Sequence, residues 1–180
     1  LEELDTSVLE AIIANSSDST AQARRIRFIG LAMEPVSQEV VAQLLTNKAD
    51  AVRLSLIRAL RQRQILFQNQ PALITGDQIA ILFEKGTRLI KMTALRYLRS
   101  SELAAGPWQK RVIELCAVQT DTGVLDECAL TQDRLGNAQA ELKMPAASQL
   151  GWSTQVALAR ARAIRKDTAG LVAQIDASLA

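Results

Sequence analysis

Two cysteines, Cys116 and Cys128, are the residues whose spacing most directly implies chemistry. A polar turn at 120–123 separates two segments of helical periodicity, and each cysteine lies six residues from Thr122, one on either side. Positions equidistant from the turn of an antiparallel helix pair face each other, and helix axes about 8–10 Å apart bring their Cα atoms close to disulfide separation. We therefore expect the two cysteines to face each other, as a disulfide or as two small buried thiols.

A disulfide would also indicate a compartment, because such bonds persist in the periplasm or outside the cell and rarely in a reducing cytosol. No apolar run reaches the roughly 18–20 residues of a membrane helix. The chain starts at Leu1 without a signal peptide, as a mature or excised part of a longer protein would. We expect an extracytoplasmic, periplasmic protein; a cytoplasmic protein with reduced thiols is the alternative.

Catalytic chemistry has few residues to draw on. The chain has no histidine, which removes the commonest general base and metal ligand, and its two cysteines cannot supply a four-thiolate zinc site. The glycine-rich phosphate-binding and nucleophile motifs do not occur. The adjacent Asp126 and Glu127 would point about 100° apart on a helix, and Glu2 and Glu3 form a terminal charge run. The sequence therefore predicts no enzyme, no cofactor and no metal site.

A row of arginines is the main candidate for a binding surface. Each of the three follows a small residue in a predicted helix by two positions; they are Arg61, Arg96 and Arg165. The segments 51–63 and 88–99 each contain four basic residues and no acid. Such a row either lies solvated or contacts acidic groups or phosphates of a partner. We expect these arginines to be more exposed than Arg53 and to be the partner-binding residues.

Two tryptophans lie at predicted helix ends. Trp108 follows Pro107 and Trp152 follows Gly151. A tryptophan at such a junction either fills a gap between packed elements or serves as a binding residue. We expect both to pack in the core.

The elements that must position these residues form an internal repeat. Four prolines recur at spacings of 36, 36 and 38 residues, at Pro35, Pro71, Pro107 and Pro145. A small residue followed by an aliphatic one recurs in mid-helix at steps of 29, 35, 35 and 34 residues, at 30–31, 59–60, 94–95, 129–130 and 163–164. Proline favours the junctions between helices, and a small residue lets two helix axes approach closely. The repeat predicts five units in a single domain, at approximately 1–34, 35–70, 71–106, 107–144 and 145–180.

Each unit is predicted to be a helix pair. Aliphatic residues at three- and four-residue spacing predict first helices at 6–15, 37–46, 76–85, 107–119 and 146–151. The same spacing predicts second helices at 21–33, 50–64, 87–100, 123–135 and 154–166. Ser37 and Asp77 are the expected capping residues, and a helix at 168–179 is expected to close the array.

The second helix of the second unit resembles a HEAT repeat. Asp50-Ala51-Val52-Arg53 is followed by Ile57, Ala59 and Leu60, as in that family's pattern of Asp, Val-Arg and spaced aliphatics. Arg24 and Arg88 stand at the same offset as Arg53, six residues before the small residue, whereas Gly123 and Ala157 replace the arginine in the last two units. The resemblance implies a right-handed α-solenoid in which Arg24, Arg53 and Arg88 form a structural row paired with acids such as Asp50. It also implies scaffold or adaptor work.

Composition limits the function classes. The 180 residues are 48% hydrophobic but only 3% aromatic, which suits closely stacked aliphatic helices, and the net charge is +2. We expect a non-catalytic protein-protein interaction scaffold, as part of a larger envelope or secretion assembly, with another protein as its partner. The first alternative is a nucleic-acid binder using the basic ridge, which the lack of aromatics among the arginines argues against. The second is a helical regulatory or C-terminal domain of a larger enzyme.

Overall fold

The chain is all-helical wherever it is described. The computed structural model describes residues 5–16, 18–67, 70–101, 103, 106–135 and 147–164. These residues contain nine α-helices, two short 3-10 helices and no strand, which confirms the predicted all-α class. The chain divides into two compact units, Leu1–Gly106 and Pro107–Ala180. The single domain of five repeats stays a prediction.

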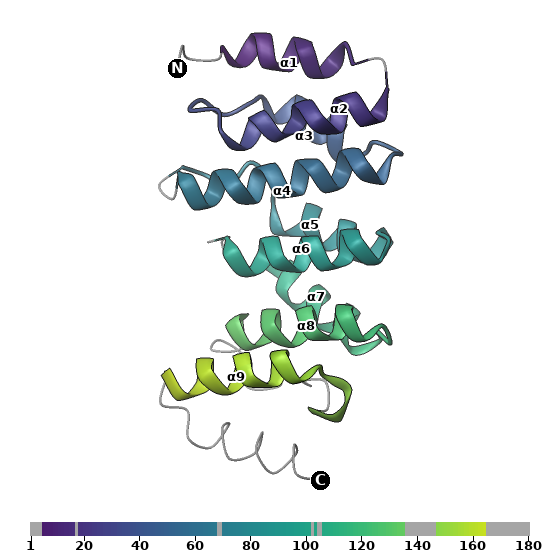
Figure 1. Ribbon diagram of the computed structural model, residues 1–180, viewed down its shortest axis with the longest axis vertical. Helices are drawn as coiled ribbons and strands as arrows, with labels where there is room; N and C mark the ends of the chain where they lie inside the picture. The colour runs from purple at the N-terminus through teal and green to yellow at the C-terminus, as the bar shows by residue number, and fades with distance from the viewer. Residues whose placement is uncertain are drawn as a thin grey trace. The chain divides into compact units, whose positions relative to one another are not determined.

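The first unit is a stack of short helices (Figure 1). Its elements are α1 (Thr6–Ala14), α2 (Ser19–Ile26), the 3-10 helix η1 (Arg27–Gly30), α3 (Gln38–Leu45), α4 (Asp50–Leu66), α5 (Gly76–Lys85) and α6 (Arg88–Ser100). The long helix α4 is central, since it contacts α2, η1, α3 and α6. The helix α5 packs on α6, and α1 packs on α2. Most bounds agree with the predicted ones to within one or two residues.

Side-chain caps begin α1, α2, α3 and α5 of the first unit, whereas α4 and α6 have none. Asp18 Oδ1 accepts hydrogen bonds from the backbone N–H groups of Thr20 and Ala21, both at 2.8 Å. Ser37 caps α3 as predicted, by accepting from the N–H of Val40 at 3.3 Å. The prediction for Asp77 was wrong, because the N-cap of α5 is Thr75, in a capping box with Gln78. Asp77 lies in the first turn, where its charge favours the helix dipole.

The second helix of the first pair is shorter than predicted. The expected helix at 21–33 ends at Ile26 and continues only as η1 to Gly30. A Cβ atom on Gly30 would lie 2.8 Å from the carbonyl oxygen of Ala59, so the chain touches the backbone of α4 here. Beyond it, the Ala32 and Met33 carbonyls accept hydrogen bonds from the Arg63 side chain. A continuing helix would use these carbonyls for its own hydrogen bonds.

The repeated small residues lie in the core, with one exception. Gly30, Ala59, Ala94 and Ala129 are all buried, and the last two have no exposed surface. Around them the core is aliphatic, as the composition indicates. The fifth small residue, Ala163, is exposed near the end of α9, which contradicts its predicted place at a helix crossing. A small residue followed by an aliphatic one does not by itself distinguish a helix crossing from a helix end.

The second unit contains α7 (Pro107–Ala117), α8 (Thr122–Leu135), the 3-10 helix η3 (Ala147–Gln149) and α9 (Trp152–Ile164). The helix α8 contacts both α7 and α9, and Leu125, Ala129, Leu150 and Leu158 form a core cluster. The predicted short helix at 146–151 is η3, after which the Gly151 N–H donates to Asp126 Oδ1 at 2.9 Å. The predicted closing helix at 168–179 lies outside the described residues.

Candidate functional site

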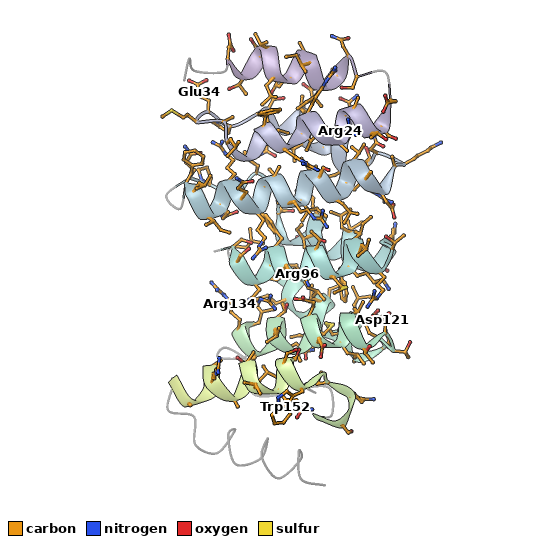
Figure 2. All side chains as sticks on the ribbon, viewed as in Figure 1. Arg24, Glu34, Arg96, Asp121, Arg134 and Trp152 are labelled. Carbon is orange, nitrogen blue, oxygen red and sulfur yellow. A yellow bond between two sulfur atoms is a disulfide. The ribbon has the colours of Figure 1, made fainter. Side chains whose placement is uncertain are left out.

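A groove between α4 and α6 gathers two residues of the predicted arginine row. It has a volume of about 210 Å³ and is lined from α4 by Arg58, Arg61, Gln62, Ile65 and Leu66, and from α6 by Thr93 and Arg96. The α4 residues are spaced three and four apart, so they form one stripe along that helix. Figure 2 shows Arg96 on α6. Arg165, the third member of the row, lies outside the described residues.

The two helices that form the groove run in the same direction. At their beginnings, the Thr87 hydroxyl donates to Asp50 Oδ2 at 2.7 Å, and near their ends Arg61 Nε donates to Ser100 Oγ at 3.2 Å. The Ser100 hydroxyl itself lies 3.0 Å from the Arg96 carbonyl, within its own helix. Side-chain hydrogen bonds therefore hold α4 and α6 in register on either side of the groove.

The charge of the groove is positive. Three of its seven lining residues are arginines and none is an acid. Arg58 is exposed, whereas Arg61 and Arg96 are half-buried, in the same range as Arg53, so the expected contrast in exposure is not seen. Because a guanidinium presents two parallel N–H donors, arginines in such a groove suit carboxylates or phosphates.

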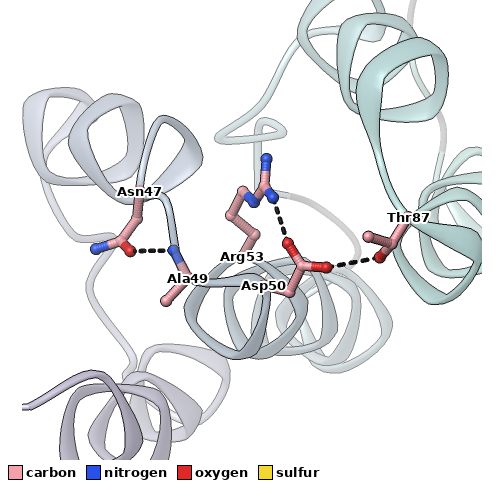
Figure 3. Close-up of polar contacts among 5 residues, drawn as sticks. All are labelled: Asn47, Ala49, Asp50, Arg53 and Thr87. Atoms are coloured by element: carbon pink, nitrogen blue, oxygen red, sulfur yellow. Dashed lines mark hydrogen bonds and ion pairs between the residues drawn. The ribbon is translucent and has the colours of Figure 1, made fainter.

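The other arginine row behaves differently at each position. Arg53 forms an ion pair with Asp50, as expected, and the two residues lie three positions apart in α4 (Figure 3). The hydrogen bond from Thr87 and that from Arg53 lower the pKa of Asp50. Arg24 and Arg88 are exposed. The hydrogen bond between Asp50 and Thr87 links α4 to α6.

A ladder of amides that the sequence analysis missed lies near the same end of these helices. Asn47 accepts a hydrogen bond from the Ala49 N–H at 2.9 Å (Figure 3). It also donates to Gln22 Oε1 at 3.2 Å. Gln22 in turn donates to the Ile13 carbonyl at 3.3 Å. The ladder joins α1, α2 and the start of α4. Asparagine at a helix start was the available signal, since it favours such turns.

Arg63 is a second residue that the sequence analysis missed. Its side chain is buried, with 4% of its surface exposed, and it donates to the Ala32 and Met33 carbonyls and to Gln70. The guanidinium also lies 5.0 Å from the centre of the Phe67 ring. Burial lowers the pKa of Arg63. Arg63 therefore fastens the segment after η1 to α4 and belongs to the framework rather than to the groove.

The two tryptophans differ. Trp108 is buried, with 4% of its surface exposed, which confirms the predicted core role. Trp152 is 76% exposed at the beginning of α9, so the prediction that it packs in the core was wrong (Figure 2). Leu150 and Leu158, on either side of it in the sequence, are the residues that join the core cluster with Leu125 and Ala129.

Cys116 and Cys128 form a disulfide between α7 and α8. Their Cα atoms lie 5.7 Å apart, and both side chains are buried. The prediction that the cysteines face each other is confirmed. Asp126, one of the two adjacent acids considered for catalysis, accepts a hydrogen bond from the Gly151 N–H. The other, Glu127, is buried in α8.

The comparisons with known proteins do not extend this description. No protein-family model, curated protein or solved structure matches the chain. In the part of the chain that the structure describes, no group of three or more His, Cys, Asp or Glu could hold a metal ion. None of the described helices is long and apolar enough to span a membrane.

Proposed function

We propose that this chain is a non-catalytic protein-protein interaction module, and that the groove between α4 and α6 is its partner-binding surface. The observation that carries the proposal is the collection of Arg58, Arg61 and Arg96 in one groove with no lining acid. Exposed Ile65 and Leu66 add apolar surface to it. Arginine is enriched at protein–protein interfaces, and exposed apolar surface is what a protein partner can cover.

The proposed architecture is a right-handed solenoid of HEAT-like helix pairs. It is supported by the parallel course of α4 and α6, whose hydrogen bonds join residues 37 and 39 positions apart, close to the predicted repeat length. The contact of Gly30 with Ala59, two members of the small-residue series, supports it further. An experimental structure with a left-handed or irregular stacking of the pairs would contradict this architecture.

We further propose an extracytoplasmic, periplasmic location, supported by the disulfide between Cys116 and Cys128. The test is the intact mass of protein isolated from its natural compartment and alkylated with and without reductant. We expect no alkylation before reduction and two alkyl groups after it. Two alkyl groups on the unreduced protein would remove the support for this location.

The partner-binding proposal is tested by affinity purification from an extract of the source cells. We expect the wild-type chain to retain one protein in stoichiometric amount and the Arg61→Glu/Arg96→Glu variant to lose it. Arg24→Glu is the matched control, because Arg24 is an exposed arginine on α2, away from the groove lining. A melting temperature close to that of the wild type establishes that each variant is folded. Equal retention by the double variant would overturn the proposal.

A further inference from the structure

The groove between α4 and α6 has two chemically different ends. Arg58, Arg61 and Arg96 supply positive charge, and Ile65 and Leu66, one turn further along α4, are 51% and 54% exposed. Such large aliphatic side chains at half exposure, side by side on one helix stripe, leave apolar surface that a partner can cover. A ligand that fills the groove must therefore satisfy cations and an apolar surface at once.

We propose that the groove binds an acidic segment of a partner protein, in which a carboxylate lies close to an aliphatic side chain. This inference rests on the proposed protein-binding function and names its partner's chemistry. The carboxylate contacts the guanidinium groups, and the aliphatic side chain packs on Ile65 and Leu66. Because no acid lines the groove, charge complementarity favours a negatively charged ligand.

The side chain of Arg61 is already oriented before a ligand binds. Its Nε donates to Ser100 Oγ at 3.2 Å, which restrains the orientation of the guanidinium, and Arg61 lines the groove. No ion pair joins Arg58 or Arg61 to an acid among the residues that the structure describes. A side chain that is already ordered loses less conformational entropy when it binds, so Ser100 is a positioning residue for Arg61.

One polar side chain of the groove suits a peptide backbone. Gln62 is exposed and offers both a donor and an acceptor. A peptide carries the N–H and C=O groups that match this side chain. Thr93 is buried, and its hydroxyl donates to the Leu89 carbonyl at 2.7 Å within its own helix.

A protein segment fits the groove better than a nucleic acid does. No aromatic side chain lines the groove, so nothing there stacks on a base, and phosphates make no use of Ile65 and Leu66. The volume of about 210 Å³ accommodates a few side chains and not a duplex. Clustering of the charge in one groove, with a net charge of only +2 for the chain, also differs from an extended basic stripe.

The test is selection of a phage-displayed library of random twelve-residue peptides on the oxidised full chain. The library is first depleted on the Arg61→Gln/Arg96→Gln variant. We expect the retained peptides to share Asp or Glu within a few positions of Leu, Ile or Val. A retained set without acids, or one that binds the variant equally well, would overturn the inference.

Fluorescence anisotropy with the most enriched peptide then tests each part of the groove. We expect Arg61→Gln and Ile65→Ser each to weaken binding about tenfold or more, and Ser100→Ala to weaken it severalfold, consistent with the loss of a charge-assisted hydrogen bond, of apolar contact and of positioning. Arg24→Gln and Ile81→Ser are the matched controls on exposed residues outside the groove, and should bind like the wild type. Replacing the peptide's acids by their amides should abolish binding.

Two further probes separate the alternatives. A twenty-nucleotide single-stranded DNA and phosphatidylglycerol vesicles are measured on the same variants. Binding of either through Arg61 and Ile65, without binding of the acidic peptides, would overturn the inference. If no acidic peptide binds but the natural partner is still lost from the Arg61→Glu/Arg96→Glu variant, the inference fails while the protein-binding function stands.

Discussion

At the scale of single residues, the arginines of one helix have three separate roles. Arg53, near the start of α4, pairs with Asp50; Arg61 is oriented by Ser100 beside the groove; and Arg63 is buried against backbone carbonyls. Their spacing puts them on different sides of the same helix. Residue type alone therefore does not identify the binding arginine, and the partner that each one finds decides its role.

Asp50 should make stability depend on acid pH. Its pKa is lowered by Thr87 and Arg53, so the folded state favours the carboxylate. This contribution is present above the usual value of 3.8 and is lost as the pH falls through the lower folded value. Since the side chain is 37% exposed, the contribution should stay below about 1 kcal/mol.

The measurement is urea unfolding of the wild type and of Asp50→Asn at about pH 7 and at acid pH. We expect the wild type to be more stable at neutral pH and the difference to shrink in acid. Thr87→Val replaces the hydroxyl that donates to Asp50 by a methyl group. The stability of this variant should therefore fall less than that of the wild type between about pH 7 and acid pH. If the wild type and Asp50→Asn differ in stability by the same amount at both pH values, the Asp50 charge does not contribute to stability.

Arg63 should be the arginine that matters most for stability. Arg63→Ala would leave the Ala32 carbonyl without its hydrogen-bond donor, would leave the Met33 carbonyl with Gln70 as its one remaining donor among the described residues, and would remove the contact with Phe67. We expect a loss of about 2–4 kcal/mol in the free energy of unfolding. Arg58→Ala on the same helix is the control, because Arg58 is exposed and its loss should cost less than about 0.5 kcal/mol. Equal midpoints for the two variants in denaturant would refute this role.

At the scale of the helices, small residues determine how closely the elements pack. Gly30 touches the backbone of α4 at Ala59, and Ala94 is fully buried in α6. A larger side chain at either place would separate the helices or strain their backbones. Both residues belong to the small-residue series of the sequence, whose step is 29 residues from Gly30 to Ala59 and 35 from Ala59 to Ala94.

Ala59→Asp should unfold the first unit. The substitution buries an unpaired carboxylate in a contact where 2% of Ala59 is exposed, and should cost more than about 3 kcal/mol. Ala51→Asp is the matched control on the same helix, because Ala51 is exposed in the first turn. Circular dichroism melting curves distinguish the two. A melting temperature for Ala59→Asp equal to that of the control would show that the residue is misplaced in the core.

At the scale of the whole molecule, the chain consists of two compact units, and the disulfide belongs to the second. In the proposed solenoid each helix pair is stabilised by its neighbours in the sequence, so stability is local. The disulfide closes a short loop of sequence separation 12, and the entropy of that closure corresponds to about 2–3 kcal/mol.

Loss of the disulfide should therefore lower the local stability of the second unit. For Cys116→Ser/Cys128→Ser we expect faster hydrogen exchange in α7 and α8 and unchanged exchange in α4. Hydrogen-exchange mass spectrometry of the wild type and the double variant measures this, with Ser153→Ala, at an exposed serine of the second unit, as the control. Equally faster exchange in α4 would contradict the local stability that the proposed solenoid implies.

The sequence by itself determined the helices and the local pairing. Periodic aliphatic residues predicted most helix bounds, and symmetric placement about a short turn predicted that Cys116 faces Cys128, because both signals depend on neighbours along the chain. The choice between a disulfide and two thiols was open in the sequence. Only the tertiary structure decided where α2 ends, that Arg63 is buried, that Trp152 is exposed and that Arg58, Ile65 and Leu66 share a groove with Arg96. These features depend on contacts between helices distant in sequence, and a residue's type does not specify which carbonyl, ring or helix will lie beside it.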